Sequence, residues 1–185
     1  KFLTVDKFPQ AGFISKGEVY LEEAAGGGAV VAANIAKVTG ASVDFFTALG
    51  KDAAGEKAAK RLRALNLNTS IAWRDKPTRK GISIRDARGE RAITVLGDRL
   101  QPSGKDLLPW DELKKFDGVF VTATDFDGLH QCRKANVMCA TPRVGLNSFH
   151  KSNITLDALI GSALDPDEHV ASSIFKPSPK LRIET

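Results

Sequence analysis

The residues with the clearest chemical potential form two glycine motifs near the start of the chain. Gly26, Gly27 and Gly28 stand before a small-residue segment, 29–40, that predicts a helix. Backbone amides at such a helix start can approach a hydroxylated ligand closely, because glycine carries no Cβ. The alternative is that these glycines only cap the helix and pack it against a strand. A Gly-x-Asp-x-x-Gly motif at 50–55 follows one strand later and favours the ligand-binding interpretation.

Other familiar chemistries lack the residues that they need. The sequence contains no dinucleotide fingerprint in a first βα turn, no Walker loop and no Gly-x-Ser-x-Gly elbow. Its histidines, His130, His150 and His169, have no helical i, i+4 spacing and form no compact set of metal ligands. We interpret them as surface residues.

The composition is that of a soluble globular protein, either one domain or part of a larger one. Hydrophobic residues make up 42% and charged residues 26% of the 185 positions. The net charge of +5 could indicate a nucleic-acid partner, but the basic residues are scattered and no recognition motif accompanies them. We therefore expect a solvated basic surface and no nucleic-acid partner.

Targeting signals and cysteine usage bear on the cellular compartment. No apolar run approaches the roughly 20 residues that a membrane span needs, and residues 1–7 are too charged for a secretory signal. Cys132 and Cys139 fit no metal spacing. These observations predict a cytoplasmic protein with reduced thiols and no membrane partner.

Strands and helices alternate along most of the chain. Apolar segments predict strands at 43–49, 118–122, 137–140, 156–160 and 181–183. Helices are predicted at 29–40, from the second glycine motif to near residue 65, at 110–115 and at 126–134. Strands without polar alternation, joined by helices over short connections, indicate an α/β fold with a parallel sheet that is covered on both faces.

Two segments, at about 14–22 and 79–97, differ because apolar and polar residues alternate in them. Residues 81–85 and 92–96 predict a hairpin, with the turn at 86–89. Strands of this kind have one wet face. We therefore expect a small antiparallel sheet that projects from the main one.

These motifs resemble those of the ribokinase-like PfkB carbohydrate kinase family over nearly the whole chain. The shared features are the glycines before an Ala-rich helix, the motif at 50–55, a Phe-Pro-x-x-Gly at 8–12 and a strand end at 140–142 like the family's Asn-Pro. The resemblance implies an α/β, ribokinase-like three-layer sandwich with a mainly parallel central sheet and a small β lid. Residues 1–185 would form a partial kinase domain, with lid strands at about 14–22 and 79–97.

The resemblance also implies which residues meet the sugar. Gly26, Gly27 and Gly28 would supply backbone amides. Thr124 and Asp125 stand where the family has a strand ending in a polar or acidic sugar contact. We therefore expect these five residues to bind the substrate.

A metal role is implied for Asp165 and Glu168. Their segment resembles the family's Asn-x-x-Glu motif, in which the Glu helps to organise Mg²⁺ and phosphate. It follows an apolar strand ending near Ile160, where α/β sheets place ligands. The alternative is a helix start, with Pro166 at the first position and acidic residues favoured by the helix dipole.

The sequence departs from the family's pattern in three ways. Within the Gly-Gly-Lys-Gly-Ala-Asn pattern, Gly28 replaces the Lys and Val31 replaces the Asn, which argues against ribose as the substrate. The family's first acidic sugar ligand is expected upstream of Lys1. The signature Asp-Thr-x-Gly-Ala-Gly-Asp, which supplies the general base and an anion hole, does not occur. We expect the general base to lie beyond Thr185. The C-terminal part of the fold is then missing from this chain.

The function implied is ATP-dependent phosphorylation of a sugar or nucleoside hydroxyl, with Mg²⁺ as cofactor and ATP as co-substrate. The chain as given is expected to be inactive, because the base and the anion hole are missing. One alternative is a non-catalytic ligand-binding or dimerisation module derived from a sugar kinase, and another is an unrelated α/β nucleotide-binding protein. If the protein is a homodimer, the lid strands are the expected interface, because their apolar face needs cover.

Overall fold

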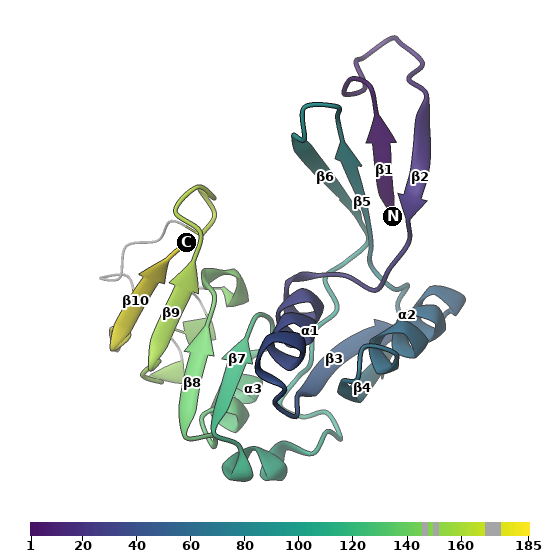
Figure 1. Ribbon diagram of the computed structural model, residues 1–185. Coiled ribbons are helices and arrows are strands. Elements are labelled where there is room, and N and C mark those ends of the chain that lie inside the picture. Colours follow the sequence, from purple (N-terminus) through teal and green to yellow (C-terminus); the bar gives the residue numbers. More distant parts are fainter. Residues whose placement is uncertain (146–147, 150–151, 169–174) are drawn as a thin grey trace.

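The computed structural model describes residues 1–145, 148–149, 152–168 and 175–185 and shows an α/β fold with three sheets (Figure 1). Two of the sheets contain only parallel strands, and the third projects away from them. No helix in these ranges is both long and apolar enough to cross a membrane.

The larger parallel sheet has the strand order β10-β9-β8-β7. Its strands are β7 (Gly118–Val121), β8 (Val137–Ala140), β9 (Ala158–Gly161) and β10 (Leu181–Glu184). Every neighbouring pair is parallel, as the apolar, non-alternating sequences of these segments predict. The four predicted strands are thus confirmed, with bounds that differ by at most two residues.

The smaller parallel sheet pairs β3 (Asp44–Gly50) with β4 (Asn68–Arg74), and α2 (Ala53–Arg63) connects the two strands. The sequence predicts β3 and α2, but it does not predict β4. This strand escapes detection because it opens on three polar residues and ends on an arginine, which leaves few apolar positions. Its main-chain pairing with β3 over the whole length of both strands decides its conformation.

Helices cover both faces of the parallel strands. Side chains alternate along a strand, so Phe45 and Phe46 of β3 point to opposite faces. Phe45 packs on the core cluster that includes residues of α1 and α2, whereas Phe46 packs on the cluster that includes Trp110 and Leu129. The ring centroids of Phe46 and Trp110 are 5.4 Å apart. The result is the helix–sheet–helix sandwich that the resemblance implies.

The remaining helices are placed by the same two clusters. Their bounds are α1 (Gly27–Thr39), η1 (Trp110–Lys115), α3 (Phe126–Cys132) and η2 (Pro142–Val144). The two labelled η are 3₁₀ helices. The predictions for 29–40, 110–115 and 126–134 are confirmed. The largest fully buried side chains are those of Phe175, Leu129, Met138, Leu156 and Leu159, so the deepest part of the core lies under the larger parallel sheet.

The third sheet, the lid, has the strand order β2-β1-β5-β6 and stands away from the parallel strands (Figure 1). Its strands are β1 (Phe2–Val5), β2 (Gly17–Leu21), β5 (Lys80–Arg85) and β6 (Arg91–Leu96). The hairpin of β5 and β6 and the strand within 14–22 confirm the prediction. The expectation of a purely antiparallel sheet is wrong, because the unpredicted strand β1 pairs in parallel with β5.

Candidate functional site

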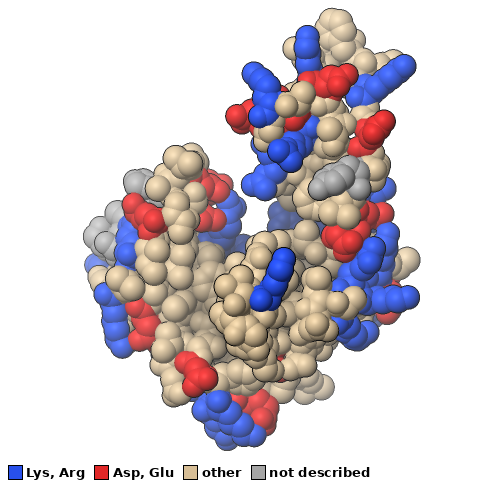
Figure 2. All heavy atoms as spheres, viewed as in Figure 1, with Lys and Arg blue, Asp and Glu red and all other residues tan. Residues whose placement is uncertain are grey.

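The candidate site is the crevice between the lid and the carboxyl ends of β7 and β8, next to the start of α1 (Figures 1 and 2). Open α/β sheets bind their ligands outside the carboxyl ends of parallel strands. Figure 2 shows Lys and Arg side chains on both walls of this hollow. We refer to the crevice by the residues that border it: Gly26–Gly28, Arg99, Thr122 and Arg143.

The three predicted glycines have three different environments. Gly26 is the N-cap of α1 and has a φ of +125°, which only glycine adopts without strain. A Cβ on Gly27 would meet no protein atom within 4 Å, so the space in front of it is open. A Cβ on Gly28 would lie 2.9 Å from the Thr122 Oγ1, which makes this glycine a packing residue. Sugar binding by the triplet stays a prediction, and Gly27 is the position best placed for it.

The motif at 50–55 forms a hydrogen-bond network that is centred on Asp52. Asp52 caps α2, and its Oδ1 accepts a hydrogen bond from the Gly55 amide at 2.8 Å. Thr78 donates its hydroxyl to Oδ1 at 2.6 Å and its amide to Oδ2 at 2.8 Å. These bonds, led by the one from the Thr78 hydroxyl, lower the pKa of Asp52 to about 2. The carboxylate therefore ties the start of α2 to the segment that leads into the lid.

Thr124 and Asp125 are occupied by contacts within the protein. The buried Thr124 donates its hydroxyl to the Pro102 carbonyl at 3.0 Å. Asp125 caps α3 through the Gly128 amide and also accepts from Ser103 and Gly104. Burial opposes ionisation, but these hydrogen bonds outweigh it and lower the pKa of Asp125. Both side chains hold the loop before η1, and the prediction that they contact a sugar gains no support from their placement.

Asp165 and Glu168 both pair with Arg143. Their carboxylates contact its Nη2 and Nε atoms, and this contact, led by the one with Glu168, raises the pKa of Arg143. The second oxygen of Glu168 accepts from the Ser162 amide at 2.9 Å. Within the described ranges no three His, Cys, Asp or Glu side chains are grouped so as to hold a metal. As placed, the two carboxylates do not fit a Mg²⁺ site, and their metal role stays a prediction.

Sequence reasoning missed Arg99, Thr122 and Arg143. Arg99 donates from Nη1 to the Arg143 carbonyl at 2.6 Å and from Nη2 to the Thr122 carbonyl at 2.7 Å. Burial lowers the pKa of Arg99, and the positive charges of Arg79 and Arg143 lower it further. Thr122 and Arg143 could have been found, because Thr122 is the last residue of the predicted strand at 118–122 and Arg143 lies three residues after the predicted strand at 137–140. Arg99 carries no such signal, since it lies in the loop that leaves the lid.

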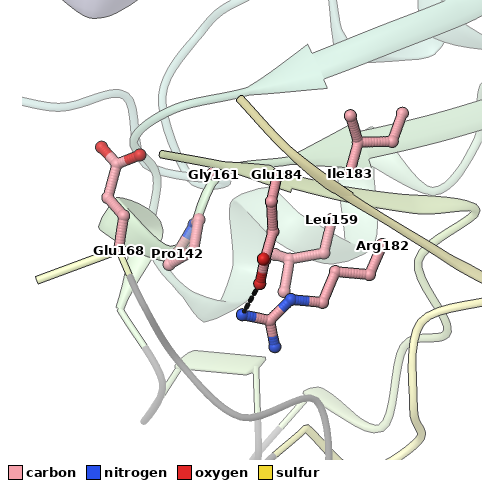
Figure 3. A pocket seen from close by; sticks show the side chains of 7 residues that line it. All are labelled: Pro142, Leu159, Gly161, Glu168, Arg182, Ile183 and Glu184. Atoms are coloured by element: carbon pink, nitrogen blue, oxygen red, sulfur yellow. Dashed lines mark ion pairs between the residues drawn. The ribbon is translucent and has the colours of Figure 1, made fainter. Parts of the chain in front are cut away.

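A small pocket lies at β9 and β10, beside Pro142 and Glu168 (Figure 3). Its cavity volume of about 10 Å³ has room for about one water molecule and cannot enclose a sugar. Arg182 and Glu184, which line it, form an ion pair of 2.6 Å. A larger hollow of about 270 Å³ lies against η1 and α3, away from the carboxyl ends of the parallel strands. The open crevice is therefore the better candidate for substrate binding.

Several solved structures with the same architecture are ribokinases or phosphofructokinases. Ribokinase from Thermotoga maritima superimposes with a TM-score of 0.65 at 21% identity, over 88% of this chain and 55% of that protein. Ribokinase from Giardia lamblia gives 0.65 at 17% identity, over 88% and 58%. Phosphofructokinase-2 from Escherichia coli gives 0.68 at 15% identity, over 99% and 68%. At these identities the likeness establishes the fold, and the chain spans little more than half of the two ribokinases.

The sequence itself matches a family. No curated protein sequence gives a significant match to the chain. The pfkB family of carbohydrate kinases, however, matches residues 5–159, which include the lid strands β2, β5 and β6, the glycine motifs and the parallel strands from β3 to the first half of β9. On this match, supported by the ribokinase-like fold, the chain belongs to the pfkB family of carbohydrate kinases.

Proposed function

We propose that this chain provides the acceptor-binding platform and the lid of an ATP-dependent carbohydrate kinase. The reaction would transfer the γ-phosphoryl group of ATP to a hydroxyl of a sugar or nucleoside. The observation that carries this proposal is the open space before Gly27, at the start of α1 and beside the strand ends. Amides at a helix start without intervening Cβ atoms suit a polyhydroxylated ligand.

The lid would act by covering the acceptor. Of its three connections to the rest of the fold, one joins β2 to α1, and the other two are the segments before β5 and after β6, next to the crevice. Closure of such an element removes water, which would otherwise compete with the acceptor hydroxyl for the phosphoryl group. The three carboxylates that the sequence predicted for the site, Asp125, Asp165 and Glu168, are engaged by contacts within the protein. A general base is therefore still to be expected beyond Thr185.

We propose ATP as the co-substrate and Mg²⁺ as the cofactor because the chain belongs to this kinase family. Phosphoryl transfer needs a divalent cation that neutralises charge on the phosphates. Because Arg143 holds Asp165 and Glu168, we derive no step of the reaction through a metal at these residues. The cytoplasm is the compartment that we propose, in agreement with the two free cysteines, Cys132 and Cys139.

A second candidate function is a dimerisation or ligand-binding module without catalysis. It is favoured by the apolar side chains that the lid exposes: Val19 is 61% exposed, Ile93 57% and Val95 51%. Ile93 and Val95 are two residues apart on β6 and so lie on one face. A homodimer that covers this face is also compatible with a kinase, so dimerisation alone does not distinguish the two functions.

A coupled ATPase assay distinguishes them. The 185-residue chain and the complete gene product are each given ribose, fructose, adenosine, fructose 6-phosphate and 2-keto-3-deoxygluconate. We expect acceptor-dependent turnover by the complete gene product and none above background by the 185-residue chain, since base catalysis alone contributes about 10²–10⁴-fold. Turnover by the 185-residue chain would contradict the expected position of the base. Binding of an acceptor without any turnover in either protein would favour the module.

A further inference from the structure

Three arginines converge at the base of the lid. Arg79 lies directly before β5, and Arg99 lies three residues after β6, so they mark two of the three points where the chain passes between the lid and the rest of the fold. The two passages are neighbours, since a Cβ on Gly97 would lie 3.8 Å from the Cα of Arg79. Arg143 follows β8 in η2. All three residues are exposed to solvent, although the guanidinium of Arg99 is partly desolvated.

Arg99 is fixed across the ends of two neighbouring strands. Its hydrogen bonds go to the carbonyl oxygens of Thr122, which follows β7, and Arg143, which follows β8. A guanidinium carries five N–H donors, and these contacts use two of them. The remaining donors are therefore held at the carboxyl edge of the sheet, where α/β proteins bind ligands.

The charge in this cluster is only partly balanced. Arg143 is paired with Asp165 and Glu168. Among the residues that the structure describes, no carboxylate pairs with Arg79 or Arg99. Like charges held together are unfavourable: the pKa of Arg99 is lowered first by burial and then, to a smaller extent, by the positive charges of Arg79 and Arg143. A purely structural tie explains the two hydrogen bonds of Arg99, but it does not explain Arg79, for which the described part of the chain offers no hydrogen-bond or ionic partner.

Thr122 lies next to both the three arginines and the glycines at the start of α1. Thr122 accepts a hydrogen bond from Arg99 through its carbonyl, and its hydroxyl lies beside Gly28, 2.9 Å from the position that a Cβ would occupy. The amides at the start of α1, a helix of 13 residues, thus open into the same crevice as the guanidinium groups. Helix starts and arginines both favour oxyanions, and arginine does so with directed, charge-assisted hydrogen bonds.

We propose that Arg79 and Arg99 bind an oxyanion carried by the acceptor, so that the substrate is a sugar phosphate or a sugar acid rather than a neutral sugar or nucleoside. This inference rests on the proposed kinase function and narrows it. Phosphate and carboxylate share the chemistry that the arginines recognise, and fructose 6-phosphate and 2-keto-3-deoxygluconate serve as probes for the two. The phosphates of ATP are the competing explanation for the cluster.

The test compares Arg79→Gln with Arg63→Gln in the complete gene product. Arg63 is an exposed arginine at the end of α2 and serves as the matched control. Turnover is measured for each acceptor and for ATP, binding of fructose and fructose 6-phosphate is measured by calorimetry, and melting curves report folding. We expect Arg79→Gln to raise the KM of one anionic acceptor about 10- to 100-fold, with unchanged KM for ATP and unchanged melting temperature. Arg63→Gln should behave as the wild type.

The outcomes separate this inference from the kinase proposal. Turnover that prefers fructose, ribose or adenosine over both anionic probes supports the kinase and overturns the anion site. A raised KM for ATP in Arg79→Gln assigns the cluster to the nucleotide and also overturns it. Arginine-dependent binding of an anionic probe without turnover of any acceptor supports the anion site and overturns the kinase. Neither turnover nor binding by any probe overturns both.

Discussion

Replacement of Gly55 by alanine should destabilise the protein strongly, although alanine is the better helix former. Gly55 is buried in the first turn of α2. A Cβ there would lie 2.1 Å from the Gly50 carbonyl oxygen and 2.8 Å from the Thr78 Oγ1. Since non-bonded atoms settle at roughly 3.5 Å, the turn must open by about 1 Å or more. The displaced Gly55 amide is the one that donates to Asp52, so the hydrogen bonds that link the start of α2 to the segment leading into the lid would weaken.

The magnitude follows from two opposing effects. Overpacking of a tight site costs about 1–3 kcal/mol, and the contact with a backbone oxygen places Gly55 at the upper end of that range. Greater helix propensity of alanine offsets about 1 kcal/mol. We therefore expect Gly55→Ala to lower the free energy of unfolding by about 2 kcal/mol. With a urea dependence of about 2 kcal/mol per molar for a chain of this size, the unfolding midpoint should fall by about 1 M.

The same substitution at Gly27 provides the control, because a Cβ there meets no atom within 4 Å. Gly27→Ala should leave the stability unchanged or raise it by up to about 1 kcal/mol. Urea unfolding of the wild type and both variants, followed by circular dichroism, makes the comparison. Equal midpoints for Gly55→Ala and Gly27→Ala, within about 0.2 M, would refute the reasoning from the contact at Gly50.

Three further predictions concern substrate binding, pH and assembly. Gly27→Val should raise the KM for the acceptor and leave the KM for ATP unchanged; equal losses for both would indicate a folding defect. Because the pKa of Asp52 is lowered to about 2 by its bonds from Thr78 and Gly55, its contribution to stability is present above about pH 4 and lost as the pH falls toward 2. The urea midpoints of wild type and Asp52→Asn should therefore converge over that range, and a constant difference would contradict this. If the wild type is a dimer by analytical ultracentrifugation, Val95→Asp should convert it to a monomer, whereas Leu107→Asp, a change at a fully exposed loop residue, should leave it dimeric. A wild type that is monomeric at micromolar concentration excludes the lid interface.

Much of the fold could be predicted because its signals are local. The helix at 27–39 begins at a glycine, contains small residues and is followed by Gly40, which the structure shows as its C-cap in the left-handed conformation. The strands at 118–121 and 137–140 are continuous apolar runs, which a sheet covered on both faces requires. The strands β1 and β4 escaped prediction because their conformation depends on partners far along the chain. β1 pairs with β5, about eighty residues away.

The site was less predictable, since its polar residues take roles that depend on distant partners. Asp125 follows a buried strand, as a ligand contact would, but Ser103 and Gly104 approach it from a loop more than twenty residues earlier. Asp165 and Glu168 have the composition of a metal site, and only the position of Arg143 shows that a guanidinium holds them. Residue type and strand order locate the crevice, whereas the partner of each polar side chain follows from tertiary structure alone.

Arg143 gives those two carboxylates a use that needs no metal. Three guanidinium groups in one crevice would repel one another, and the positive charges of Arg79 and Arg143 add to burial in lowering the pKa of Arg99. Asp165 and Glu168 approach Arg143 through its side chain, while Arg99 contacts its carbonyl oxygen. The carboxylates therefore hold Arg143 and fix the strand end that holds Arg99; the three arginines and two carboxylates together keep a net positive charge, and no carboxylate in the described part of the chain pairs with Arg79 or Arg99. A ligand that enters the crevice meets positive charge from these two residues, which is why the test of the anion site rests on Arg79.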